Sequence, residues 1–354
     1  MKRTLLRLLI AIVVLLVGYL LLWPVPITPA AWTPSAAPEL TGSYAQNSAL
    51  SNIERLPIDG RNPEDVAFDS QDRVYCGDDQ GRIFRFDPDG SRPEVFAQTK
   101  GRPLGLIFDA PGNLIVADAV IGLMSIAPDG EPSVLATQAE GVPFRCTNDL
   151  DIATDGTIYF TDASYRFPLT ELKADLLEHQ PNGRLLAYDP RTKQTKVLLR
   201  DLYFANGVAV SPDQAFVLVN ETGAYRVRRF WLKKDKAGQS DIFIDNLPGF
   251  PDGISSNGRD IFWVALVNRR DSGLDFLLPH PFLRKIVWRL PSFLQPSIKR
   301  YAFAIGLDTN GKVIRNLQDA SPQCFAQIAN VVEHKGNLYF GSIGENAIGR
   351  MALP

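Results

Sequence analysis

Short runs of alternating apolar and polar residues recur from about residue 50 to the end of the chain. The first four runs cover residues 66–68, 73–77, 82–86 and 94–96, and turn sequences such as Pro88-Asp89-Gly90 separate them. An apolar residue at every second position is typical of a half-buried β-strand, and Pro, Asp and Gly favour the turns between strands. The pattern therefore predicts a unit of four antiparallel strands in about 40 residues.

The unit recurs six times, and each copy opens with a related sequence. The openings are PEDVAF (63–68), PLGLIF (103–108), TNDLDI (147–152), ANGVAV (205–210), PDGIS (251–255) and, more weakly, IANVV (328–332). In the first four copies an apolar strand begins ten residues after the second residue of the opening, at Val74, Leu114, Ile158 and Phe216; in the fifth the step is nine, to Ile261. The second residues of the openings therefore occupy equivalent places in equivalent units.

This repetition predicts an all-β fold, a six-bladed β-propeller over residues 50–354. Two units are longer than the rest, with insertions near 167–182 and 268–300. Helical spacing at Leu172 and Leu176, and at Phe282 and Ile286, predicts helices in both insertions. The last unit lacks an outer strand, which residues 52–58 can supply. A β-sandwich followed by a second domain is the alternative, but it leaves six aligned openings unexplained.

The N-terminus is predicted to be a membrane element. Residues 1–23 contain an apolar run close to the roughly 20 residues that cross a bilayer. Lys2, Arg3 and Arg7 precede this run, so the N-terminus is expected in the cytoplasm and the remainder on the periplasmic or luminal side, anchored by a single pass. A cleaved signal peptide is the competing interpretation. Residues 24–49, rich in Pro, Ala, Ser and Thr, are expected to form an extended linker.

Composition excludes several classes of function. The formal charge of −2 argues against a nucleic-acid partner. Only three cysteines (Cys76, Cys146 and Cys324) and three histidines are present, without the spacing of a zinc site. The partners left are a small-molecule substrate and the membrane.

Four of the six second residues carry side-chain oxygens: Glu64, Asn148, Asn206 and Asp252. In a ring of blades these side chains converge on the axis. Ca²⁺ prefers carboxylate and amide oxygens, and two carboxylates balance its charge, so the sequence predicts one Ca²⁺ in the central tunnel. Taken alone, any one of the Asn and Asp residues is more typical of an ordinary turn, and it is the four in register that favour the metal site.

Other residues could shape the same site. Asp65 and Asp149 directly follow predicted ligands, and either orient them or cap turns. Cys146 lies two residues before Asn148 and is expected to be a buried structural thiol that borders the site. Asp162 and Glu221, at strand ends, are candidates for an additional acid or base, or for structural roles.

Several motifs resemble the strictosidine synthase-like and adipocyte plasma membrane-associated protein family. They are TNDL (147–150), YFTD (159–162), GRLLAYDP (183–190), FANGV (204–208), NET (220–222), YRVRRFW (225–231), GFPDG (249–253) and LYFGS (338–342). The resemblance implies a six-bladed propeller whose wider relatives, including gluconolactonases, paraoxonases and diisopropyl fluorophosphatase, hold calcium in the tunnel. Carried over residue by residue, it gives the same four ligands. Plant strictosidine synthases instead use a late catalytic glutamate, and the only acid in the matching segment is Glu333.

The function expected from these observations is calcium-dependent hydrolysis of lactones, aryl esters or related esters. The metal would act as a Lewis acid, and Asp252 and Glu64 are the catalytic candidates. Two alternatives stay open: a metal-free synthase that joins an amine to an aldehyde, and a non-catalytic membrane-tethered propeller. The apolar and basic insert at 281–290 is expected either to contact the membrane or to form a lid over the channel.

Overall fold

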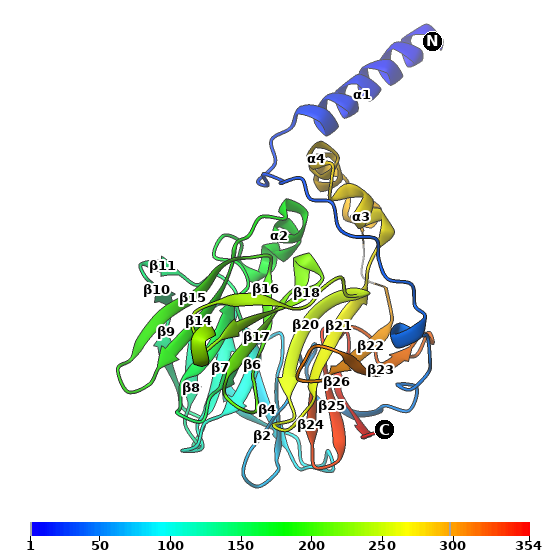
Figure 1. Cartoon of the computed structure of the whole chain (residues 1–354). Helices are drawn as coiled ribbons and strands as arrows, with labels where there is room; N and C mark the ends of the chain where they lie inside the picture. The colour runs from blue at the N-terminus through cyan, green and yellow to red at the C-terminus, as the bar shows by residue number, and fades with distance from the viewer. Residues whose placement is uncertain (1, 297–298) are drawn as a thin grey trace.

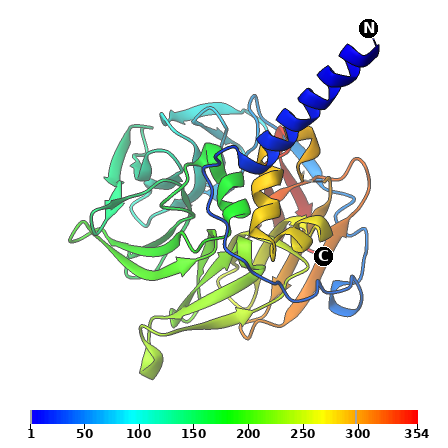
Figure 2. The ribbon, with the colours of Figure 1, turned by 90° about the horizontal axis from the view of Figure 1, so that it is seen from above.

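Six four-stranded antiparallel sheets stand around a common axis and form the blades of a propeller (Figure 2). The computed structural model describes residues 2–296 and 299–354. Blades one to three consist of β2 (Ala67–Phe68), β3 (Val74–Gly77), β4 (Arg82–Phe86) and β5 (Glu94–Gln98); β6 (Pro103–Phe108), β7 (Leu114–Asp118), β8 (Gly122–Ile126) and β9 (Pro132–Ala136); and β12 (Thr147–Ile152), β13 (Ile158–Asp162), β14 (Gly183–Asp189) and β15 (Gln194–Leu202). The predicted fold class is confirmed.

The remaining three blades follow the same order. They consist of β16 (Ala205–Val210), β17 (Phe216–Glu221), β18 (Arg226–Trp231) and β19 (Ser240–Ile244); β20 (Gly249–Ser256), β21 (Phe262–Arg269), β22 (Ala302–Leu307) and β23 (Val313–Asp319); and β24 (Ile328–His334), β25 (Asn337–Ser342), β26 (Ala347–Ala352) and β1 (Glu54–Pro57). A small hairpin of β10 (Gln138–Ala139) and β11 (Val142–Pro143) precedes blade three.

The hydrophobic core is divided among the spaces between neighbouring blades. Every residue of β7, β13 and β17 is buried, because each second strand is covered by a blade on either side. Between blades five and six, Trp263 packs in one cluster with Val331 and Phe340. Strands covered on both faces read as continuous apolar runs, whereas the outer strands alternate and are half exposed, as in β19.

The two ends of the chain meet in blade six. β1 pairs antiparallel with β26, with Leu56 opposite Ile348. Both side chains are buried against Phe84 and Phe86 of blade one. The N-terminal strand therefore completes the last blade and covers its edge, as the unused residues 52–58 suggested.

Both insertions lie at one end of the propeller, over the mouth of the central tunnel (Figure 1). The first contains η2 (Leu169–Glu171) and α2 (Leu172–Glu178), and the second contains α3 (Ser272–Leu277), α4 (Pro281–Arg289) and η5 (Ser292–Leu294). Each follows the second strand of its blade, and α2 packs against α4. Two further 3₁₀ turns, η3 (Thr222–Ala224) and η4 (Lys234–Lys236), flank β18.

Helix α1 (Lys2–Leu22) extends away from the same end, and all its described side chains lie outside the core (Figure 1). At 21 residues it is about 30 Å long, enough to cross a bilayer. The following residues are extended, as expected, but they do not stand free between a membrane and the propeller. They run across the helical insertions, where Ile27 is buried against Phe167 and Trp288, and reach η1 (Gly42–Tyr44) at blade five.

Candidate functional site

All six second residues of the repeated openings line one small cavity on the propeller axis. They are Glu64, Leu104, Asn148, Asn206, Asp252 and Ala329. The cavity volume is ≈ 10 Å³, about the space that one water molecule or one ion needs. The register derived from the repeats therefore holds around the whole ring, and the four oxygen-bearing side chains do converge. Their role as metal ligands stays a prediction.

A local irregularity of the inner strands directs these side chains. Strand pairing shifts register between Thr147 and Leu150 in β12, between Ala205 and Val208 in β16, and between Pro251 and Ile254 in β20. Such a bulge takes residues out of the ladder and re-aims their side chains. The predicted ligands thus lie at the mouth end of each inner strand, where the regular ladder has not yet begun.

The third residue of an opening joins one blade to the next. Asp149 accepts hydrogen bonds from the backbone N–H of Leu150, at 2.8 Å, and of Val208 in the next blade, at 2.9 Å. Asp65 accepts in the same way from Val66 and Leu106. Neither of the two predicted roles describes these carboxylates. Through these bonds they orient no predicted ligand, and they connect inner strands instead of capping turns.

Glycine occupies the third position where a neighbouring side chain needs the space. A Cβ built on Gly253 would lie 2.7 Å from the amide oxygen of Asn330, and one on Gly105 would lie 2.8 Å from Asp149. A carboxylate or amide side chain of one blade therefore occupies the space that glycine leaves in the adjacent blade.

The Asn206 amide has a defined orientation. Its nitrogen donates to Asp252 Oδ1 and, at 3.1 Å, to Thr222 Oγ1, whose own hydroxyl donates to Pro251 O. With both N–H bonds committed, the amide oxygen is the atom that remains for a cation. Asn220 of blade four fixes the backbone of blade five by donating to Asp252 O at 2.7 Å.

Acidic side chains are concentrated around the cavity. Burial raises the pKa of Asp252 well above its usual range, and the nearby Glu64 carboxylate adds to the effect. Burial likewise raises the pKa of Asp65 to about 7, and that of Asp149 well above its ordinary value with Asp65 contributing. A bound cation would lower all of these pKa values, because it stabilises the charged forms.

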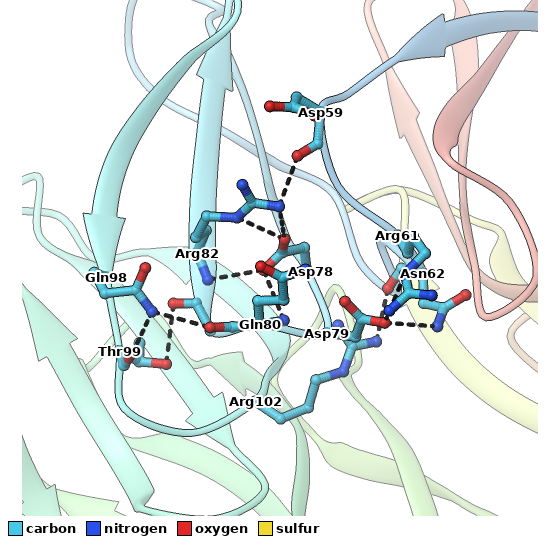
Figure 3. Close-up of polar contacts among 11 residues, drawn as sticks. Asp59, Arg61, Asn62, Asp78, Asp79, Gln80, Arg82, Gln98, Thr99 and Arg102 are labelled. Atoms are coloured by element: carbon cyan, nitrogen blue, oxygen red, sulfur yellow. Dashed lines mark hydrogen bonds and ion pairs between the residues drawn. The ribbon is translucent and has the colours of Figure 1, made fainter.

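One guanidinium group partly offsets this charge. Arg102 Nη2 lies 3.4 Å from Glu64 Oε2, and this cation opposes the effect of burial, which nevertheless raises the pKa of Glu64. The same nitrogen donates to Asn62 O at 2.6 Å. Figure 3 shows Arg102 beside Asn62, with the Asp78–Arg82 pair next to it; Arg82 also donates to Asp59 O. These contacts hold the segment that carries Glu64.

A larger pocket of ≈ 530 Å³ adjoins the small cavity, and this volume suits a drug-sized ligand. It shares with the cavity Glu64, Leu104, Asn148, Asn206 and Asp252. Its apolar wall includes Leu169, Leu172, Leu176, Phe204, Phe250 and Leu274. Arg102 and Lys173 provide positive charge in the lining. Arg102 was missed from the sequence, although it lies two residues before Leu104, a position that also lines the pocket in blades one, four and five.

The other sequence candidates lie outside both cavities. Cys146 is fully buried among apolar side chains, and burial raises the pKa of its thiol well above the usual range, so it is structural. Asp162 pairs with Arg184, and Glu221 pairs with Arg226 and Arg228. These ion pairs commit both carboxylates to holding strands together.

Glu333, the only acid in the late segment, lies at the opposite end of its strand. It accepts from Trp263 Nε1 at 2.9 Å and pairs with Arg259, which lies in the turn between β20 and β21. That turn is at the end of blade five remote from the pocket. Glu333 is therefore not brought to the tunnel mouth.

The chemistry of the donor set fits Ca²⁺. Two carboxylates and two amides would leave room for water and a substrate oxygen among the six to eight ligands of this ion. Within residues 2–296 and 299–354, no group of three or more His, Cys, Asp and Glu side chains has the arrangement of a metal site. The predicted set is of a different kind, since half of its members are amides.

Comparison with known sequences gives consistent matches. A family model described as strictosidine synthase matches residues 148–235, and one described as strictosidine synthase-like, N-terminal, matches residues 42–86. Protein STRICTOSIDINE SYNTHASE-LIKE 7 of Arabidopsis thaliana is 35% identical over 321 residues, covering 89% of this chain and 82% of that protein. The adipocyte plasma membrane-associated protein of Rattus norvegicus is 33% identical over 372 residues, covering 99% of both.

Solved structures share the architecture at lower identity. A gluconolactonase from Xanthomonas campestris superimposes with a TM-score of 0.63 and 18% identity, covering 93% of this chain and 99% of that one. The calcium-binding protein regucalcin from Agrobacterium tumefaciens gives 0.60 and 14%, covering 84% and 92%. At these identities the likeness establishes the fold alone.

Proposed function

The chain belongs to the strictosidine synthase-like family, as its motifs indicated, and from this premise and the tunnel geometry we propose that it is a calcium-dependent hydrolase of lactones and related esters. The observation that carries the proposal is the shared lining of the two cavities. Four convergent oxygen-bearing side chains form the end of an apolar pocket of ≈ 530 Å³. A neutral ester would thus have its alkyl part among leucines and its carbonyl beside the predicted cation site.

The roles of the residues follow from their positions. Glu64, Asn148, Asn206 and Asp252 would hold Ca²⁺, which when bound supplies positive charge that polarises a carbonyl oxygen. Hydrolysis adds water to the carbonyl carbon and breaks the bond to the leaving oxygen. Asp252 is proposed to accept the proton of that water and pass it to the leaving oxygen. Alternatively, its carboxylate attacks the carbonyl carbon itself and displaces the leaving oxygen, and water then hydrolyses the resulting anhydride. The leucines of α2 would hold the apolar part of the ester.

The neighbouring folds suggest which substrates to test first. One similar structure is a gluconolactonase, so small lactones come before other esters, and phenyl acetate is a convenient aryl ester. Because this likeness concerns the fold only, the assay must decide the substrate class.

The test uses the full chain in detergent. We expect hydrolysis of a lactone or phenyl acetate to disappear with a strong chelator and to return with Ca²⁺. Asp252→Asn should lower kcat/KM by at least about 100-fold, because the substitution removes both a ligand charge and the proton acceptor. The chelator should also lower the melting temperature of the unmodified protein, and less so that of the variant.

Glu333→Gln is the matched control. It changes a buried acid in the same way but outside the pocket, so activity should stay within about two-fold. Hydrolysis that survives both chelation and Asp252→Asn would rule the mechanism out. Amine–aldehyde condensation abolished by Glu333→Gln would instead favour the synthase alternative.

A further inference from the structure

The exposed aromatic side chains gather at one end of the molecule. Among the described residues, those with large exposed fractions are Tyr19, Trp23, Tyr165, Phe276, Phe282 and Phe293. The first two belong to α1 and its end, and the others lie on the connections that surround the pocket mouth. Phe293 is 81% exposed and Phe276 63%. Exposed apolar side chains elsewhere, such as Val134 and Ile314, are isolated aliphatic residues on outer strands, which is ordinary for a protein surface.

The C-terminal end of α1 is fixed to this aromatic face. Arg289 of α4 donates from Nη1 to Leu20 O at 2.7 Å and from Nε to Trp23 O at 2.7 Å. The Tyr19 hydroxyl donates to Arg289 O at 3.4 Å. A cation that binds the last carbonyl groups of a helix also interacts favourably with its dipole. With α1 across a bilayer, α4 lies at the membrane surface where α1 emerges.

The charge of the segment suits lipid headgroups. Residues 276–300 contain no Asp or Glu, but five Lys and Arg residues. Two of these, Arg284 and Arg289, are buried, whereas the Lys299 side chain is 79% exposed and lies 3.9 Å from the Asp271 carboxylate. Exposed aromatic rings beside such cations are typical of helices that lie in the interface of a membrane.

We infer that the face formed by α3, α4 and η5, carrying Phe276, Phe282, Phe293 and Leu294, docks on the leaflet from which α1 emerges, and that the pocket draws lipophilic esters from that leaflet. The same insertions build the pocket wall, through Leu274 of α3 and Leu172 and Leu176 of α2. A substrate dissolved in the bilayer would therefore meet the pocket mouth directly. The docking of this face on the leaflet is independent of the proposed function, whereas the identity of the ligand as an ester rests on the proposed function.

Docking is tested with the full chain in phosphatidylcholine nanodiscs. Cys76, Cys146 and Cys324 are buried, so a cysteine added at the surface can be labelled selectively. An environment-sensitive fluorophore on Phe282→Cys is expected to be quenched at least about five-fold more by spin-labelled lipid than one on Thr309→Cys. Thr309 is exposed in the turn between β22 and β23, at the opposite end of the blade. Equal quenching at both positions would overturn the docking.

Supply from the bilayer is tested without catalysis. A long-chain alkyl ketone carrying a diazirine is incorporated into the nanodiscs, irradiated, and located in the protein by mass spectrometry. We expect label on residues 169–177, and at least about five-fold less in Phe282→Asp/Phe293→Asp, while Val134→Asp, which adds an acid at a distant apolar site, labels normally. Absence of label there, or equal label in the double variant, would overturn the supply. Neither outcome bears on the calcium assay with phenyl acetate, so the two failures are distinguishable.

Discussion

His179 is a buried histidine at the junction of three parts of the structure. It follows α2 with a left-handed backbone, φ 51°, and its ring stacks on Trp32 of the linker with centroids 4.4 Å apart. Its Nε2 lies 2.9 Å from Gly223 O, and the ring is 4% exposed. Because burial disfavours the imidazolium ion, the pKa of His179 is lowered to about 4. The histidine thus joins the linker, α2 and blade four in its neutral form.

This lowered pKa predicts a loss of stability in acid. The unfolded chain takes up the proton near pH 6.5 and the folded chain only near pH 4, so stability is complete above pH 6.5 and falls as the pH decreases to 4. At pH 4.5 the loss should be about 2–3 kcal/mol. His179→Gln should remove that part of the decrease, seen as a smaller difference between the melting temperatures at pH 7 and pH 4.5.

Buried acids change the stability in the opposite direction as the pH falls, so the histidine must be measured against them. Burial raises the pKa of Asp151 and Asp175 to about 6, so the folded state binds their protons more readily and gains stability as the pH falls through 6. The contribution of the histidine is therefore the difference between the pH dependence of the unmodified protein and that of His179→Gln. An unchanged pH dependence in His179→Gln would contradict the assignment.

Residue positions could be predicted where the repeat imposes them. Glu64, Asn148, Asn206 and Asp252 converge because each occupies the same place in its blade. The bond of Asp149 to the next blade could not be predicted. Whether a side chain reaches the backbone of a neighbouring blade depends on how closely the two inner strands approach. A carboxylate beside a ligand looks the same in sequence whether it orients a side chain or joins two strands.

At the scale of elements, one side chain holds the insertions together. Arg284 of α4 is fully buried and donates from Nη1 to Leu177 O at 2.9 Å and to Glu178 O at 3.3 Å, at the end of α2. Its Nη2 donates to Leu278 O at 2.9 Å and to Ala30 O of the linker. The carbonyl groups at a helix end carry partial negative charge, which explains how the cation is tolerated there.

Arg284→Met is expected to loosen both insertions together. The substitution keeps much of the volume but removes the arginine donor from Leu177 O and Ala30 O, whereas Glu178 O and Leu278 O keep the backbone N–H groups of Ala30 and Trp32. The expected cost is about 2–4 kcal/mol. Hydrogen exchange of α2 and α3 should accelerate, while the blades keep their protection. Lys285→Met, at the next position of the same helix, is the matched control and should change neither. Exchange confined to α4 would contradict a common role for the four bonds.

The elements themselves could be predicted to different degrees. Strands and turns follow from period-two patterning, and helices in the insertions from the spacing of Leu172, Leu176 and Phe282. The path of the linker could not, because residues 24–49 have no periodicity. Its position depends on distant partners, such as the bond from Trp32 N to Leu278 O and the stacking of Trp32 on His179.

At the scale of the whole molecule, the ring depends on its closure. β1 supplies the outer strand of blade six, and Leu56 is buried between that blade and blade one. Without β1 the full length of β26 becomes an exposed edge next to an apolar cluster. A ring has no terminal blade that can remain intact by itself, since each core lies between two neighbours. Loss of one outer strand should therefore weaken the entire propeller.

A chain of residues 60–354 should accordingly lack a cooperative transition or melt at least about 10 °C below the full chain, with aggregation through the β26 edge. A chain of residues 24–354, which loses only α1, keeps β1 and the linker and should melt close to the full chain. Circular dichroism and light scattering on the pair separate loss of closure from loss of the anchor. Equal melting temperatures would mean that blades one and six hold together through the inner strands, where Asn330 donates to Asp65, and that the outer strand merely covers an edge.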